Sequence, residues 1–394
     1  MSAPNTVTAP HHREPALDGL RGLAVTLVFV FHYGGGLTSH NPLIRFFGHL
    51  TAAGWTGVQI FFVLSGFLIT GILWRDLQST QPHLLRNFYI RRILRIVPLA
   101  WAAITLSCLL CLAMGFNPPA LHGYIFEYLF LQDIPSLVRT TEHVQKLALF
   151  HFWTIAVELQ FYLLWPLLLL LCRRSLRAAQ ALCFAVFALS LTANAAFVLH
   201  PGLIPPELQQ RSPLTYSGAL SLGGFLALSL RQSTSPEAKL LQRLALPALL
   251  LGSAAYIAAS LQRGSFLLLG KQYITGLPSV WIASAGLLLL LLRPSVPHTL
   301  FSNAILRFIG RYSYGIYVLH VLLEPLFSYI GVAVSHRSSG YFFLATRLIT
   351  GFPITQAFAW VSYQLLEFPF LKLKRHFPSA PALLTSETPN IGHL

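Results

Sequence analysis

Three ionisable side chains lie inside long apolar stretches of this sequence, where burying a charge is costly. They are Arg21 and His32 in the first such stretch, and Glu158 in a later one. Ionisable groups in apolar spans are rare and commonly functional. Imidazole titrates near neutrality, so His32 could serve as general base toward a hydroxyl group. Glu158, predicted at a similar depth, could orient that imidazole as in a catalytic triad, or could hold an acceptor hydroxyl.

The spacing of Arg21 and His32 places both on one face of a helix. They are 11 residues apart (32 − 21 = 11), which at 3.6 residues per turn is close to three turns and ~16 Å along the axis. A ligand with a charged head at Arg21 could therefore reach His32 with an extended arm. Acyl-coenzyme A has that shape, since a phosphorylated nucleotide is followed by a long, thin arm that ends in a thioester.

A second basic group is the pair Arg92 and Arg95, three residues apart and so on one helix face. Arginine binds phosphate through planar, bidentate donors.

Purely structural roles stay open for Arg21, His32, Arg92, Arg95 and Glu158. Arginines at the ends of apolar spans also act as cytoplasmic anchors or bind anionic lipid, His32 could be a packed histidine, and Glu158 could pair with an arginine.

Membrane-spanning helices must position these residues. Of the 394 residues 55% are hydrophobic and 10% are charged, and the mean hydropathy is +0.62. A soluble fold carries about 25% charged residues, and a spanning helix needs ~20 mostly apolar ones. We therefore predict an all-α, polytopic integral membrane protein with about ten transmembrane helices, at 18–37, 52–74, 95–114, 150–171, 179–199, 214–230, 244–262, 274–292, 312–332 and 343–364.

Basic residues fix the predicted orientation. With the N-terminus in the cytoplasm, 19 of the 27 Lys and Arg residues fall on the cytoplasmic side and 8 outside (19 + 8 = 27), as the positive-inside rule requires. Both termini are then cytoplasmic. We predict a cytoplasmic tail over 1–14, a transmembrane domain over 15–370, and a C-terminal tail over 371–394 that we expect to be disordered.

The net charge of +15 does not indicate nucleic-acid binding, because the charges sit at the ends of apolar runs rather than on a solvated face. The four cysteines, at positions 108, 111, 172 and 183, lie in or beside apolar runs. No second pair has the spacing of metal ligands, so we expect no metal site.

Six short motifs, in order along the chain, resemble the signature of the acyltransferase-3 family of transmembrane O-acyltransferases. Arg21 and His32 match its R-x10-H pattern. The other five are the segments 61–66 (FFxxSG), 92–95 (RxxR), 153–162 (similar to W-S-L-x-x-E-x-Q-F-Y), 313–320 (S-Y-x-x-Y-L-x-H) and 367–369 (E-x-P). Two departures are Thr154, where the family usually has Ser, and Leu159, where many members carry a second Glu.

The resemblance implies transfer of an acyl group, usually acetyl, from cytoplasmic acyl-CoA to a hydroxyl of a carbohydrate or lipid-linked glycan, in a bacterial inner membrane. It makes His32 the catalytic residue, with Glu158 in support, and Arg21, Arg92 and Arg95 the coenzyme A contacts. Ser65, Trp153 and Tyr162 would belong to the wall of the site. Ser65 could equally mark a close helix contact, and Trp153 an interfacial aromatic belt.

Two other functions fit parts of the sequence. A proton-coupled secondary transporter could use a His32–Glu158 pair, although it would not explain the Arg92–Arg95 pair or the Arg21–His32 spacing. A scaffold subunit of a polysaccharide assembly complex would need neither ionisable group.

Overall fold

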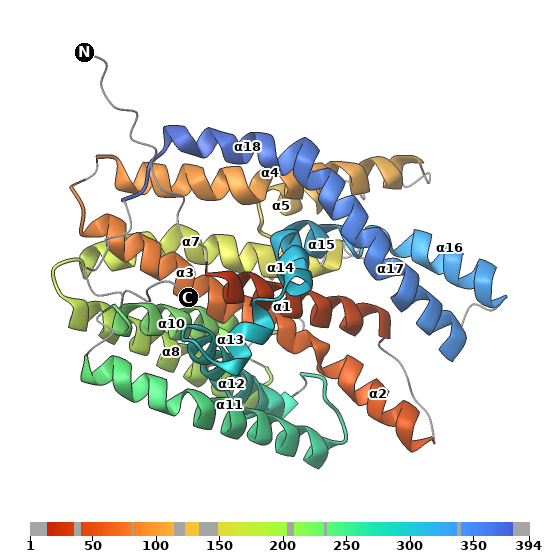
Figure 1. The fold of residues 1–394 in the computed structure, drawn as a ribbon, viewed down its shortest axis with the longest axis horizontal. Helices are drawn as coiled ribbons and strands as arrows, with labels where there is room; N and C mark the ends of the chain where they lie inside the picture. Colours follow the sequence, from red (N-terminus) through yellow and green to blue (C-terminus); the bar gives the residue numbers. More distant parts are fainter. Residues whose placement is uncertain are drawn as a thin grey trace, which may run out of the picture.

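We analysed a computed structural model of the chain, which describes residues 14–34, 41–80, 82–113, 123–133, 149–202, 209–231, 235–268, 270–336 and 340–380. These residues form a bundle of long helices, and none of them is in a strand (Figure 1). The long helices are α1 (Pro15–Gly34), α3 (Thr56–Leu77), α4 (Leu84–Ala113), α7 (Trp153–Leu171), α8 (Leu176–Leu199), α10 (Pro213–Ser229), α11 (Pro236–Arg263), α12 (Gly276–Leu291) and α17 (Tyr341–Ser362).

Shorter helices join them. They are α2 (Pro42–Ala52), α5 (Gly123–Tyr128), α13 (Val296–Phe301), α14 (Ala304–Arg311), α15 (Ser313–Leu319), α16 (Glu324–Ser335) and α18 (Phe368–Lys372). Single turns lie at η1 (Ala53–Trp55), η4 (Phe150–Phe152), η5 (Gly270–Tyr273), η6 (Tyr363–Glu367) and η7 (Leu373–His376).

Among the residues that the structure describes, seven helical segments are long and apolar enough to cross a membrane, and the pair α15 and α16 adds an eighth if its halves form one span bent by 75°. This confirms the prediction of an all-α, multi-pass membrane protein. The two remaining predicted spans, 214–230 and 343–364, coincide with helices α10 and α17. Helix α10 has 17 residues, fewer than the ~20 that a straight crossing needs.

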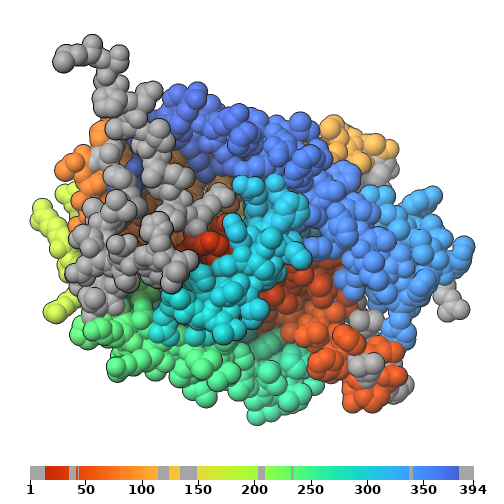
Figure 2. Space-filling view, viewed as in Figure 1, coloured from red at the N-terminus to blue at the C-terminus, as the bar shows by residue number. Residues whose placement is uncertain are grey.

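Helix α1 lies in the middle of the bundle and packs against α3, α14 and α17. Its contact with α14 is close because glycines face each other's backbone. A Cβ atom on Gly310 would lie 1.7 Å from the Asp18 carbonyl oxygen, and one on Gly22 would lie 2.3 Å from the Leu306 carbonyl oxygen. Helices α13 and α14 therefore cover the half of α1 that carries Arg21 (Figure 2).

The sharp bend between α15 and α16 has a local cause. Helix α15 ends at Leu319. Pro325 has no N–H with which to continue the hydrogen bonds of that helix, so a new helix, α16, begins with this proline in its first turn. His320 lies at this break and is 1% exposed. The bend thus brings an imidazole from the second half of the chain into the centre of the bundle.

Most of the two predicted tails, 1–14 and 371–394, lies outside the described residues, which exclude 1–13 and 381–394. At the C-terminal end, helical structure continues to His376. The chain beyond it contacts the bundle, since the Ala380 amide donates a 2.8 Å hydrogen bond to Asp76 Oδ1.

Candidate active site

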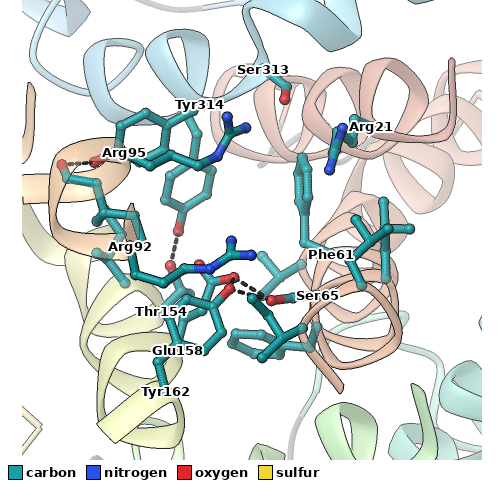
Figure 3. Close-up of a pocket in the computed structure, with 18 residues that line it drawn as sticks. Arg21, Phe61, Ser65, Arg92, Arg95, Thr154, Glu158, Tyr162, Ser313 and Tyr314 are labelled. Carbon is teal, nitrogen blue, oxygen red and sulfur yellow. Dashed lines mark hydrogen bonds between the residues drawn. The ribbon is translucent and has the colours of Figure 1, made fainter. Parts of the chain in front are cut away.

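Three of the predicted arginines line one cavity near the N-terminal half of α1 (Figure 3). We call this space, of about 130 Å³, the arginine cavity. Arg21 comes from α1, and Arg92 and Arg95 come from successive turns of α4. The cavity is completed by side chains of α3, α7 and α15, among them Ser65, Glu158, Tyr162, Ser313 and Tyr314.

The charge of the arginine cavity is mainly positive. Arg21 forms a 2.8 Å ion pair with Asp18. Within the described residues, neither Arg92 nor Arg95 has a carboxylate within 4.0 Å. The Arg92 guanidinium instead lies over the Tyr162 ring, 5.4 Å from its centroid. Three cations and the single carboxylate of Glu158 make this cavity attractive to an anion with several charges, such as a phosphorylated nucleotide.

Glu158 is held by two hydroxyl groups on the floor of the arginine cavity. Ser65 Oγ donates to Glu158 Oε1 at 2.5 Å, and the Tyr162 hydroxyl donates to the same oxygen. Ser65 Oγ and the Tyr162 hydroxyl are 2.5 Å apart. The three residues, which the sequence placed in the site, therefore form one cluster that joins α3 to α7.

A second cavity, of about 340 Å³, lies beyond the arginine cavity and contains His32, His151 and Trp153 in its wall. We call it the histidine cavity. Trp153 lies against Tyr216, with ring centroids 4.9 Å apart. Val58, Thr154 and Tyr317 line both cavities. These three residues therefore form the partition between the arginines and His32.

The partition is closed by hydrogen bonds. The Tyr317 hydroxyl lies 2.5 Å from Thr154 Oγ1 and donates to the His151 carbonyl oxygen at 2.9 Å. The Tyr317 and Thr154 side chains are buried. The Tyr317 ring is thus held in place between the two cavities by contacts of its hydroxyl with α7 and with the turn before it.

The hydrogen bonds of His32 indicate which ring nitrogen carries its proton. His320 Nδ1 lies 2.6 Å from the Tyr317 carbonyl oxygen, which can only accept, so this nitrogen is the donor and His320 Nε2 is an acceptor. His32 Nδ1 lies 3.0 Å from both His320 Nε2 and the Val28 carbonyl oxygen, and must carry a hydrogen. In neutral His32 the lone pair is then on Nε2, and that nitrogen can accept a proton.

A third histidine, His151, completes the group. Its ring centroid is 4.8 Å from that of His320 and 6.5 Å from that of His32. It is 2% exposed, and neither of its ring nitrogens has a hydrogen-bond partner among the described residues. His320 is the last residue of the 313–320 motif, and His151 lies two residues before the 153–162 motif. Applying to them the criterion that selected His32, an ionisable group in an apolar run, would have found both.

The structure does not bring Glu158 to His32. Glu158 lines the arginine cavity, His32 lines the histidine cavity, and the ring that contacts His32 Nδ1 is His320. Glu158 therefore does not orient His32 as expected, and the side chain that contacts the His32 ring nitrogen is His320. The three arginines do line one cavity, and Val58, Thr154 and Tyr317 lie between that cavity and the one that His32 lines.

Comparison with known proteins agrees with the motifs. A family model described as "Acyltransferase domain", Acyl_transf_3, matches residues 14–364. The chain belongs to the acyltransferase-3 family. The relationship confirms the resemblance that the six motifs carry.

Several proteins similar to this chain are named as O-acetyltransferases. The "Putative O-acetyltransferase SACOL0978" of Staphylococcus aureus (strain COL) is 25% identical over 386 residues, which cover 91% of this chain and 57% of that protein. Over 185 residues, 45% of this chain and 27% of its relative, the "Peptidoglycan O-acetyltransferase OatA" of Listeria monocytogenes is 29% identical. The chain thus spans little more than half the length of these relatives, or less.

A third acyltransferase-3 relative is the "O-acetyltransferase OatA" of Staphylococcus aureus (strain NCTC 8325 / PS 47). It is 31% identical over 163 residues, 39% of this chain and 24% of that protein. No solved structure matches the chain.

Proposed function

We propose that this protein transfers an acyl group, acetyl in the first instance, from cytoplasmic acyl-CoA to a hydroxyl of a carbohydrate acceptor, with His32 as the catalytic base. One observation carries the proposal. An arginine cavity that could hold the phosphates of a nucleotide lies beside a cavity containing an imidazole with an available lone pair, and Val58, Thr154 and Tyr317 line both. The names of the O-acetyltransferase relatives support acetyl as the transferred group.

In this proposal, the phosphates of the donor bind Arg21, Arg92 and Arg95. Each guanidinium offers several N–H donors in a fixed plane, and phosphate oxygens accept them in pairs. The arm of coenzyme A then runs along α1 past the partition, because Arg21 and His32 share one face of that helix. Its thioester arrives in the histidine cavity, where the acceptor hydroxyl also binds.

The chemical step follows from the protonation state of the imidazoles. His32 Nε2 takes the proton of the acceptor hydroxyl as its oxygen attacks the thioester carbonyl carbon. A C–O bond forms, the C–S bond breaks, and the sulfur leaves as the coenzyme A thiolate, which takes a proton from the imidazolium. His320 Nε2 accepts the Nδ1–H of His32 throughout, so the ring keeps its orientation while its charge changes.

The proposal places the protein in a bacterial inner membrane, with acyl-CoA and a glycan as its two substrates. The test uses membrane vesicles that contain the wild type or His32→Ala at equal levels. Each receives acetyl-CoA labelled in the acetyl group together with a glycan and lipid extract of the host. Label should reach an acceptor with the wild type alone, while both proteins bind coenzyme A.

Near-normal transfer by His32→Ala would refute the role of this residue. A transporter that uses buried ionisable groups would behave differently, since it would move a labelled sugar in response to a proton gradient without any acyl donor. Such uptake, in vesicles that consume no acetyl-CoA, would replace the enzyme proposal.

A further inference from the structure

A large apolar groove lies on the opposite side of α3 from the histidine cavity. It encloses about 560 Å³ between α2, α3, α11 and α12, which is within the range of ~300–1,000 Å³ found for ligand sites. Most of its lining is Leu, Ile, Phe, Val and Ala, with few polar side chains, such as His49, Ser253 and Ser284. A water-soluble ligand would find few hydrogen-bond partners here, so the lining favours a hydrocarbon chain.

The groove lies between helices that have the character of membrane spans, and part of its rim is exposed. The helices that form it belong to three segments with the length and apolarity of membrane spans, Ile44–Leu77, Pro236–Arg263 and Gly270–Leu291. Large apolar side chains on its rim are exposed, with Phe46 at 60% and Leu261 at 65%. Figure 1 shows α2 leaving the bundle on the side where α11 ends and α12 begins. A chain dissolved in the bilayer can therefore enter the groove without crossing water.

The groove and the histidine cavity share one wall. Val58 and Gln59 of α3 line the histidine cavity, while Thr56 and Ile60 of the same turn line the groove. The segment that follows α11 does the same, since Phe266 lines the groove and Leu267 lines the histidine cavity. The wall is thus one helix thick, and a helix with its side chains is ~10–12 Å across.

Hydrogen bonds keep this wall in place. The Phe266 carbonyl oxygen accepts from Trp55 Nε1 and from the Tyr256 hydroxyl, each at 2.7 Å. Trp55 belongs to the histidine cavity and Tyr256 to the groove, and their rings meet edge to face at 5.8 Å. A single carbonyl therefore joins the lining of both spaces.

We propose that the groove binds the hydrocarbon tail of a lipid-linked glycan acceptor, whose sugar then lies in the histidine cavity. This inference rests on the proposed function and specifies its acceptor. Ordinary bilayer phospholipid would also fit an apolar lining. Continuity with the wall of the catalytic cavity favours the acceptor, because a tail in the groove holds its headgroup within about one helix diameter of His32.

The experiment uses purified protein in phospholipid nanodiscs and a polyprenyl phosphate monosaccharide that carries a diazirine in its tail. After illumination, labelled peptides are mapped by mass spectrometry. Label should concentrate on groove-lining segments of α2, α11 and α12, and an excess of the unlabelled glycolipid should displace it while an equal excess of phospholipid should not. Label spread over all lipid-facing helices, or displaced equally by phospholipid, would show bilayer lipid in the groove and overturn the proposal.

Two variants of α11 make the test specific. Ser253→Trp fills the groove and should lower labelling at least tenfold, with Ser253→Leu as a smaller change should the first not fold. Ala258→Trp is the matched control, because Ala258 is an exposed residue of the same helix outside the groove lining. Its labelling should equal that of the wild type. Unchanged labelling in both Ser253 variants would also overturn the proposal.

The labelling result is independent of catalysis. Acetyl-CoA binding and acetyl transfer are measured on the same nanodiscs. A protein that takes up the label in the groove but neither binds acetyl-CoA nor transfers acetyl would refute the proposed function and leave the lipid site standing. A protein that transfers acetyl but shows no groove labelling would refute the lipid site alone.

Discussion

His32 is oriented by another imidazole, since His320 Nε2 lies 3.0 Å from His32 Nδ1. His320 is itself fixed at Nδ1 by the Tyr317 carbonyl oxygen, at 2.6 Å. This arrangement differs from a triad, in which a carboxylate takes the orienting place. A neutral acceptor fixes the ring and its tautomer, but it stabilises an imidazolium less than a carboxylate would.

His320 is therefore expected to act as a positioning residue, and substitutions at this site should separate binding from turnover. His320→Leu removes one of the two acceptors of the His32 Nδ1–H and leaves only the Val28 carbonyl oxygen, which does not fix the ring against α15. One hydrogen bond contributes about 0.5–1.5 kcal/mol, so kcat should fall roughly two- to tenfold. The KM for acetyl-CoA should stay unchanged, because the arginine cavity is intact. Steady-state kinetics in vesicles give both parameters.

The conservative variant His320→Gln provides the control. Its side-chain oxygen can accept from His32 Nδ1, so it should recover most of the activity that His320→Leu loses. Equal losses in both variants, or a rise in KM with constant kcat, would contradict a positioning role.

The arginine cavity should determine the affinity for the donor. Arg92→Ala or Arg95→Ala removes a charge-assisted contact worth about 1.5–3 kcal/mol, so KM for acetyl-CoA should rise roughly ten- to a hundredfold while kcat changes less. Arg91→Ala is a matched control, because Arg91 is on the same helix but contacts the Phe377 carbonyl oxygen at 3.4 Å. An equal effect at Arg91 would mean that general basic charge, rather than the cavity, binds the donor.

Glu127 should make the stability of the protein depend on pH. This residue of α5, which lies outside the membrane-spanning helices, is fully buried, and burial raises the pKa of its carboxyl to about 8. The folded state therefore holds a proton that the unfolded state loses near pH 4.5. The free energy of unfolding should fall as pH rises from about 4.5 to 8 and should change little from this cause outside that window.

The comparison is between the wild type and Glu127→Gln, which cannot ionise. Melting temperatures of the detergent-solubilised proteins are measured at pH 5.5 and pH 9. The wild type should lose more stability than the variant over this interval. Parallel losses would show that other groups cause the pH dependence.

Much of the fold could be predicted from the sequence, because lipid demands long apolar helices and those are visible in composition alone. The ends were less predictable. Helix α4 begins at Leu84 rather than near 95, because its arginine-rich first turns are helical but not apolar. Helix α11 begins at Pro236 rather than near 244, because Ser235 caps it there: the Ser235 side chain accepts a hydrogen bond from the Ala238 amide. That capping signal was present in the sequence, and the hydropathy criterion does not detect it.

The site was predictable along each helix but not between helices. The shared face of Arg21 and His32 follows from helical geometry within α1, and the same holds for Arg92 and Arg95 in α4. Which side of α7 faces α1 depends on packing, so the depth of Glu158 was insufficient to pair it with His32. The position of His320 depends on the 75° bend between α15 and α16, whereas the sequence suggested one straight span over 312–332.

The partition between the two cavities should limit wasteful hydrolysis of the donor. Tyr317 fills the junction, and its hydroxyl is held by Thr154 Oγ1 and the His151 carbonyl oxygen. Tyr317→Ala would widen the junction between the cavities and admit water from the arginine cavity to the thioester in the histidine cavity. Hydrolysis of acetyl-CoA without acceptor should then rise severalfold, while transfer to the acceptor falls. Release of free coenzyme A thiol, followed with and without acceptor, measures both rates.

Tyr317→Phe distinguishes the ring from its hydroxyl. The phenyl group still fills the junction, so hydrolysis should stay near the wild-type rate, and only the two hydrogen bonds are lost. If Tyr317→Ala instead left hydrolysis unchanged and abolished coenzyme A binding, Tyr317 would be part of the donor site rather than a partition. A rise in hydrolysis with Tyr317→Phe as large as that with Tyr317→Ala would assign the closure to the hydroxyl, and Thr154→Val should then reproduce it.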